Sequence, residues 1–171
     1  MKRGRSGAAA VAALVLVALT AGAAGAAGAT KADVSVAQYR NYLNSYCRSL
    51  TPKLKAAENG MAAAQKADDM NSFFRYFGEE LGYAKLEARL IETAQVPAAL
   101  RSRMAPAIRT AKQVNVMIDD IGTLFTSAPK LTQTQFASKL TALMKKIAGL
   151  NGPFNHQLDS AGLQDCGSKQ I

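Results

Sequence analysis

Apolar residues recur at alternating spacings of three and four in four stretches of this chain, and this periodicity limits its fold more than any other feature. The stretches cover residues 36–64, 70–91, 100–125 and 136–161. Such spacing places apolar side chains on one face of an α-helix, whereas a strand alternates with period two, a pattern that no segment shows. The sequence therefore predicts an all-α fold built from four amphipathic helices.

The residues between these stretches suit the ends of helices. Ser35 is followed three positions later by Gln38, which predicts a capping box at the first helix. Thr132 or Thr134 can cap the fourth helix, and Gly162 follows it as a C-terminal glycine would. Because short links between long helices favour antiparallel neighbours, we expect an up-down-up-down antiparallel four-helix bundle.

Three prolines, Pro52, Pro106 and Pro153, fall inside the apolar stretches. A proline inside a helix removes a backbone donor and either kinks or breaks the helix. The apolar pattern keeps its phase across Pro106 and Pro153 and slips by one residue at Pro52. We therefore expect kinked but continuous helices, with broken helices as the alternative.

The N-terminus has the layout of a secretory signal peptide. Three basic residues in the first five positions precede an apolar stretch from Ala8 to Leu19, and small residues follow as far as Ala29. The apolar stretch is shorter than the roughly 20 residues that span a bilayer. We expect cleavage after Ala29, with Ala26 as the alternative. This leaves residues 1–29 as the signal peptide and residues 30–171 as a single domain, secreted or held in the cell envelope.

The two cysteines, Cys47 and Cys166, are expected to form a disulfide. Exported proteins meet an oxidising environment, and two cysteines in a small exported domain usually pair. In the antiparallel order the end of the last helix lies level with Tyr39, so the tail can fold back to reach Cys47. We expect this bond to staple the tail to the first helix, away from any binding site.

The single histidine, His156, excludes several kinds of active site. Di-iron bundles need two Glu-x-x-His pairs, and a zinc site needs more ligands than one histidine supplies beside a disulfide. A Ser-His-Asp triad would have to use His156, which lies off the apolar face, so we interpret it as a surface residue. The sequence therefore predicts no enzyme, no metal site and no cofactor.

Carboxylates occur as neighbours in the sequence, and this arrangement does not predict an acid–base pair. Adjacent helical residues point about 100° apart, so the members of a pair do not face each other. We interpret the pairs as solvated helix faces and the first also as a helix cap. They are Asp68–Asp69, Glu79–Glu80 and Asp119–Asp120.

Basic residues gather in the second half of the chain. Between residues 93 and 158, eight basic residues stand against two acidic ones. The predicted third and fourth helices are neighbours, so one side of the bundle should be basic and attract anionic material, with solubility as the alternative role. The candidate anion-binding face comprises Arg101, Arg103, Arg109, Lys112, Lys139, Lys145 and Lys146.

Methionine and phenylalanine side chains are expected to gather at one end of the bundle, opposite the disulfide. Thioethers and aromatic rings can form an adaptable apolar pocket between helices, although plain core is the commoner role. The candidate pocket comprises Met61, Met70, Phe73, Phe74, Phe77, Met117, Phe125 and Phe136.

Two functions follow as hypotheses. The first is an exported, non-enzymatic helical bundle that binds an anionic cell-wall polymer or membrane surface through the basic face. The second is a carrier of a small hydrophobic ligand in the pocket rich in methionine and phenylalanine. Nucleic acid is a poor candidate partner because the chain is expected outside the cell and contains no recognised binding motif.

Overall fold

Four long helices follow one another in the computed structural model, which describes residues 34–170. Each predicted stretch forms one helix, so the all-α prediction is confirmed, and residues 34–170 contain no strand. The predicted signal peptide lies outside the described residues. The helices are α1 (Val36–Lys66), α2 (Met70–Thr93), α3 (Arg101–Ser127) and α4 (Gln133–Ser160), with short 3-10 turns at Ala98–Leu100 and Ala128–Lys130.

Local capping explains where the helices begin. The Ser35 hydroxyl accepts from the backbone N–H of Gln38, whose side chain reaches back to the Ser35 N–H, so the predicted capping box is confirmed. Thr132 forms the same reciprocal pair with Gln135, which selects Thr132 over Thr134 as the cap of α4. Each capping box satisfies backbone donors that a helix leaves free in its first turn.

The three internal prolines do not interrupt their helices. Pro52 lies inside α1, Pro106 inside α3 and Pro153 inside α4, and each helix continues on both sides. The expected continuity is therefore confirmed.

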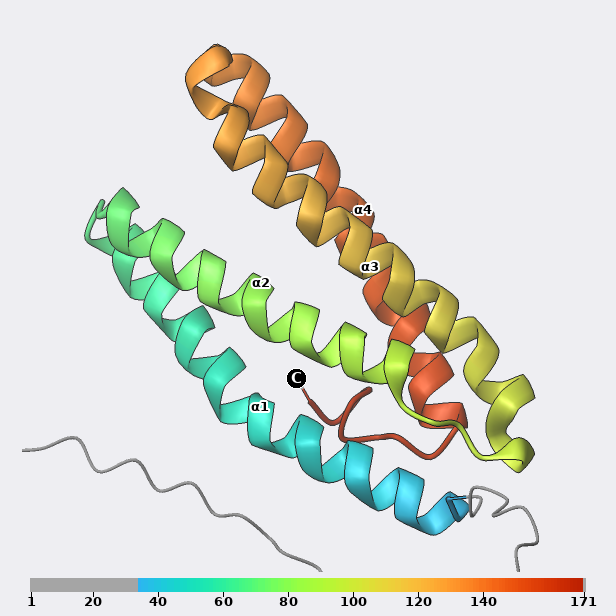
Figure 1. Cartoon of the computed structure of the whole chain (residues 1–171). Coiled ribbons are helices and arrows are strands. Elements are labelled where there is room, and N and C mark those ends of the chain that lie inside the picture. The colour runs from blue at the N-terminus through green and yellow to red at the C-terminus, as the bar shows by residue number, and fades with distance from the viewer. Residues whose placement is uncertain (1–33, 171) are drawn as a thin grey trace, which may run out of the picture. The chain divides into compact units, whose positions relative to one another are not determined.

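Helices that follow one another in the chain pack together: α1 with α2, α2 with α3, and α3 with α4 (Figure 1). Within residues 34–170, no packing of comparable extent joins α1 to α4. Residues 161–170, which we call the tail, run back from the end of α4 toward α1 and α2 (Figure 1).

The most deeply buried part of the core lies where the tail meets the helices. Apolar side chains from the four helices and from the tail share one cluster there, and their removal from water is the main force that holds these elements together. Its most buried large members are Leu43, Cys47, Ile91, Met104, Leu158, Leu163 and Cys166. Among the helices of residues 34–170, none is both long enough and apolar enough to cross a membrane.

Candidate functional site

The turn after α4 is built to send the tail toward α1. Gly162 has a φ of 82°, and the Leu163 N–H donates to the carbonyl oxygen of Leu158 at 2.9 Å, which is the Schellman arrangement expected of a C-terminal glycine. The side chain of Arg40 then donates to the Ala161 carbonyl at 2.7 Å. These contacts fix the direction in which the chain leaves α4.

The disulfide holds the tail farther along. Cys47 of α1 and Cys166 form the predicted bond, with their Cα atoms 5.0 Å apart. Arg48 and Asp165 form an ion pair at 3.3 Å beside it. The prediction that the disulfide staples the tail to α1 is therefore confirmed, and such bonds are typical of an oxidising, extracellular compartment.

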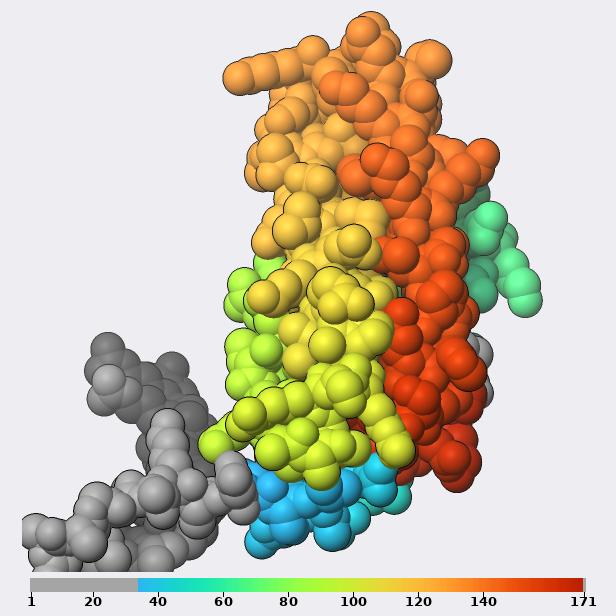
Figure 2. Space-filling view, turned by 90° about the vertical axis from the view of Figure 1, so that its right-hand side faces the viewer, coloured from blue at the N-terminus to red at the C-terminus, as the bar shows by residue number. Residues whose placement is uncertain are grey.

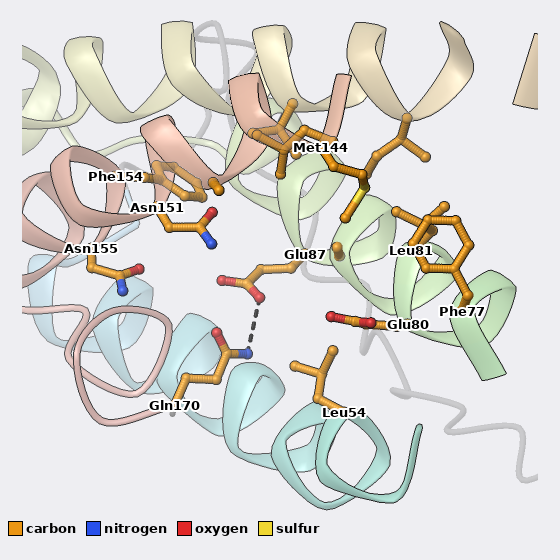
Figure 3. A pocket seen from close by; sticks show the side chains of 15 residues that line it. Leu54, Phe77, Glu80, Leu81, Glu87, Met144, Asn151, Phe154, Asn155 and Gln170 are labelled. Atoms are coloured by element: carbon orange, nitrogen blue, oxygen red, sulfur yellow. Dashed lines mark hydrogen bonds between the residues drawn. The ribbon is translucent and has the colours of Figure 1, made fainter. Parts of the chain in front are cut away.

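A cavity of about 240 Å³ opens between the helices next to this staple. All four helices and the tail contribute to its lining, with the tail supplying Gln170 (Figure 3). The lining is mostly apolar but includes two carboxyl groups and three amides, and we call this space the acid-lined cavity. Its residues are Leu54, Phe77, Glu80, Leu81, Ala84, Glu87, Val114, Ile118, Met144, Ile147, Ala148, Asn151, Phe154, Asn155 and Gln170.

Glu87 is the most deeply buried ionisable side chain of this cavity, with 7% of its surface exposed. Its Oε2 accepts a hydrogen bond from Nε2 of Gln170 at 2.9 Å (Figure 3). Burial disfavours the charged carboxylate and raises the pKa of Glu87 from 4.5 to about 7, although the bond from Gln170 opposes this rise. Glu87 therefore changes charge near neutral pH.

Glu80 lies two turns before Glu87 on the same face of α2 and also lines the cavity. Burial raises the pKa of Glu80, and repulsion from Glu58 on α1 adds to the rise. The prediction that the Glu79–Glu80 pair is solvated is thus right for Glu79, which is exposed, and wrong for Glu80, which is partly buried.

The helix register predicted a disulfide far from any pocket, whereas the bond in fact lies beside this cavity. The sulfurs of Cys47 and Cys166 and a carboxylate oxygen of Glu87 all lie within 4.8 Å of one another. Within the described part of the chain this is the one close group of three metal-ligand side chains. Because the two sulfurs are bonded to each other, the group offers a metal ion a single carboxylate.

Three of the predicted basic residues gather around a shallow groove between α3 and α4, on the face that Figure 2 presents. Lys112, Lys145 and Lys146 line it, and no ion pair engages any of them within residues 34–170. Val116 is 60% exposed there. We call this site the lysine groove; its other lining residues are Gln113, Met117, Gly149 and Leu150.

The remaining basic residues of the predicted face do not line this groove. Arg101, Arg103 and Arg109 lie on the first half of α3, and Lys139 lies on α4. All four are exposed. The structure therefore brings together three of the seven predicted residues.

The predicted pocket of methionine and phenylalanine is brought together in part. Five phenylalanines form a connected cluster across α2, α3 and α4, with neighbouring ring centroids 5.2 to 6.4 Å apart. Met117 instead lines the lysine groove, and Met70 is half exposed. Met61 is partly buried near the end of α1. The aromatic cluster comprises Phe73, Phe74, Phe77, Phe125 and Phe136.

The acid-lined cavity does not follow from the sequence pattern, although part of its signal is visible there. Glu80 and Glu87 fall at positions three and ten after Phe77, which is the spacing of the apolar face of α2. An acidic residue at the edge of such a face can be solvated or buried. In the structure Glu87 is buried, and the tail places Gln170 in hydrogen-bond contact with it.

Comparisons with known proteins find no protein-family model, no curated protein and no solved structure that matches this chain.

Proposed function

We propose that this chain is an exported, non-enzymatic helical protein that binds anionic membrane surfaces through the lysine groove. The observation that carries the proposal is the gathering of Lys112, Lys145 and Lys146 around exposed apolar surface. We also propose that the predicted signal peptide directs export of the chain. The helices would then follow the predicted up-down-up-down antiparallel order, with kinks at the three internal prolines.

The charge of the groove is available to a partner. Asp119, on the same helix as Lys112, is engaged by Lys85 of α2, whereas the three groove lysines have no acidic partner within residues 34–170. A lysine close to an anionic lipid surface contributes about 1 kcal/mol to binding. Three lysines together therefore supply an attraction that is strong at low salt and screened at high salt.

The apolar floor of the groove favours a membrane over a charged polymer. Val116 lines the groove together with the three lysines and has 60% of its surface exposed, and Met117 and Leu150 also line it. A soluble polyanion needs only charge, whereas a lipid surface accepts charged and apolar side chains together. An anionic cell-wall polymer is the competing partner, and the experiment must distinguish it from a membrane surface.

Cosedimentation with vesicles tests the proposal. The disulfide-bonded protein should sediment with phosphatidylglycerol-containing vesicles at low salt, and not with pure phosphatidylcholine vesicles or at about 1 M salt, where the screening length is about 3 Å. The triple change Lys112→Ser, Lys145→Ser and Lys146→Ser should weaken binding about a hundredfold, because three contributions of about 1 kcal/mol are lost.

A matched control removes the same charge elsewhere. Lys55→Ser, Lys66→Ser and Arg89→Ser change exposed residues of α1 and α2 and should leave most of the binding. Equal losses in the two triple variants, or no retention of the unchanged protein at low salt, would show the proposal to be wrong.

The apolar contact has its own test. Val116→Ser should weaken binding to vesicles but leave binding to soluble polyglycerol phosphate unchanged. A protein that binds this polymer and ignores vesicles would replace the membrane with a cell-wall polymer as the partner.

A second candidate function rests on the aromatic cluster. Phe73, Phe74 and Phe77 adjoin Leu140 and Met144 along a mostly apolar surface groove. Lys145 of the lysine groove also lines it. This arrangement supports the carrier of a small hydrophobic molecule. Native mass spectrometry of protein taken from its own culture medium should then show a bound lipophilic mass, and a clean ligand-free mass would exclude the carrier function.

A further inference from the structure

The acid-lined cavity has the size and walls of a small-molecule site. Its volume of about 240 Å³ exceeds the roughly 150 Å³ of an engineered apolar cavity that takes up benzene. Phe77 of α2 and Met144 and Phe154 of α4 give it apolar surfaces on two sides (Figure 3). A molecule with one ring or a short alkyl chain therefore fits within it.

Two acids point into this apolar space. Figure 3 shows the carboxyl groups of Glu80 and Glu87 directed into the space between α1, α2 and α4. Glu87 is almost wholly buried, and Gln170 is the only residue of the described chain whose side chain donates a hydrogen bond to it. Its other carboxyl oxygen receives no hydrogen bond from a side chain of residues 34–170.

No positive charge in the cavity wall compensates these acids. The lining residues include no lysine, arginine or histidine. The lining side chains from α1, α3 and α4 are uncharged, as is Gln170 of the tail, and the nearby group on α1 that affects Glu80 is another acid, Glu58. A buried carboxylate without a cation costs several kcal/mol, so Glu87 is a poor residue for this position if packing were its only role.

We propose that this cavity binds a small organic cation, an amine on an apolar body, with Glu87 and Glu80 facing the ammonium group. The apolar body would lie against Phe77, Met144 and Phe154. An ammonium group supplies both the hydrogen-bond donors and the positive charge that the two carboxylates lack. This site shares no residue with the lysine groove and does not depend on the proposed membrane function.

The walls favour an organic cation over a metal ion. Calcium takes six to eight oxygen ligands and magnesium demands near-octahedral oxygen coordination. Within residues 34–170, Glu80 and Glu87 do not belong to a common group of close metal ligands. Most of the lining is hydrocarbon, which can contact the apolar body of an amine but provides no ligand atoms for a metal ion.

Three probes of one shape separate charge from size. Isothermal titration calorimetry on the disulfide-bonded protein at pH 8 should compare 2-phenylethylamine, 2-phenylethanol and phenylacetate. The amine should bind at least tenfold more tightly than the neutral and anionic probes. Equal affinities for the three, or no binding of the amine, would overturn the proposal.

Variants locate the site. Glu87→Gln keeps the shape and should weaken the binding of 2-phenylethylamine at least tenfold, whereas Glu79→Gln, the same change at an exposed position of α2, should leave it within twofold. Ala84→Leu keeps both acids but fills the cavity, and should abolish binding while circular dichroism shows the same helix content. Equal effects of Glu87→Gln and Glu79→Gln, or full binding by Ala84→Leu, would place the amine elsewhere.

Binding should also follow the charge of Glu87. With the pKa of Glu87 at about 7, the ionised fraction rises about tenfold from pH 6 to pH 8. The affinity for the amine, which is protonated across this range, should rise by a similar factor, and Glu87→Gln should remove most of that rise. A rise of equal size in both proteins would assign the pH dependence to another group and contradict the role given to Glu87.

Discussion

At the scale of single residues, the pairing of Cys47 with Cys166 could be predicted, and the burial of Glu87 could not. The cysteine pairing follows from the number of cysteines and from the expected export, and both can be read from the sequence without knowledge of any three-dimensional contact. Glu87 is buried where the tail meets α2, and its hydrogen-bond partner Gln170 is 83 positions away in the chain. Local sequence carries no information about such a contact, so the acid is visible on the α2 face but its environment is not.

Glu87 should make the stability of the protein depend on pH. Its folded-state pKa of about 7 lies above the ordinary 4.5, so the folded state holds the proton more tightly than the unfolded chain does. The free energy of unfolding should therefore fall by roughly 3 kcal/mol as the pH rises from 4.5 to 7. Urea unfolding across this range measures the effect.

The change Glu87→Gln isolates this contribution. It removes the titrating group, so the variant should lack this fall and be the more stable protein at pH 8. Glu79→Gln, at an exposed position on the same helix, should keep the slope of the unchanged protein. Identical slopes in all three proteins would show that Glu87 does not titrate in the way its burial implies.

At the scale of secondary structure, the sequence predicts each helix well because the signals are local. Period, capping boxes and the C-terminal glycine act within a few residues, and the helices begin and end close to the predicted positions. Thr132 and Thr134 are equivalent in the apolar pattern, and only Thr132 has Gln135 three positions later to complete the box. The path of the tail beyond Gly162 depends on contacts with α1. The sequence could predict only that the tail returns to α1 to form the disulfide.

Gly162→Ala should destabilise the turn that ends α4. A residue with a side chain costs about 1 to 2 kcal/mol in the left-handed region. A Cβ atom at this position would also come within 2.6 Å of the Arg40 side chain, which holds the Ala161 carbonyl. We expect a loss of at least about 1 to 2 kcal/mol in the free energy of unfolding, measured by urea denaturation.

Gly78→Ala is the matched control for this change. Gly78 lies inside α2 and is exposed, and no neighbouring side chain lies within 4 Å of the place that an added methyl group would occupy. Alanine is the better helix former by about 1 kcal/mol, so this change should stabilise the protein. A Gly162→Ala variant as stable as Gly78→Ala would mean that the turn does not constrain the tail.

At the scale of the whole domain, the sequence predicts four helices but not which of them remain apart. The sequence period shows which face of each helix is apolar, but it does not show which other helix packs against that face. In the structure each helix packs against the next one in the chain, and α1 and α4 have little direct contact. The acid-lined cavity is lined by residues of both α1 and α4 and by the tail. The same limit applies to the basic face, of which three predicted residues meet in one groove.

The most direct test of the proposed membrane function is hydrogen–deuterium exchange of the protein with and without phosphatidylglycerol-containing vesicles. The lysine groove should be protected by the vesicles, so peptides covering residues 112–117 and 145–150 should exchange more slowly. Peptides from α1 should be unaffected. Unchanged exchange at the groove, or protection confined to α1 and α2, would contradict the proposal.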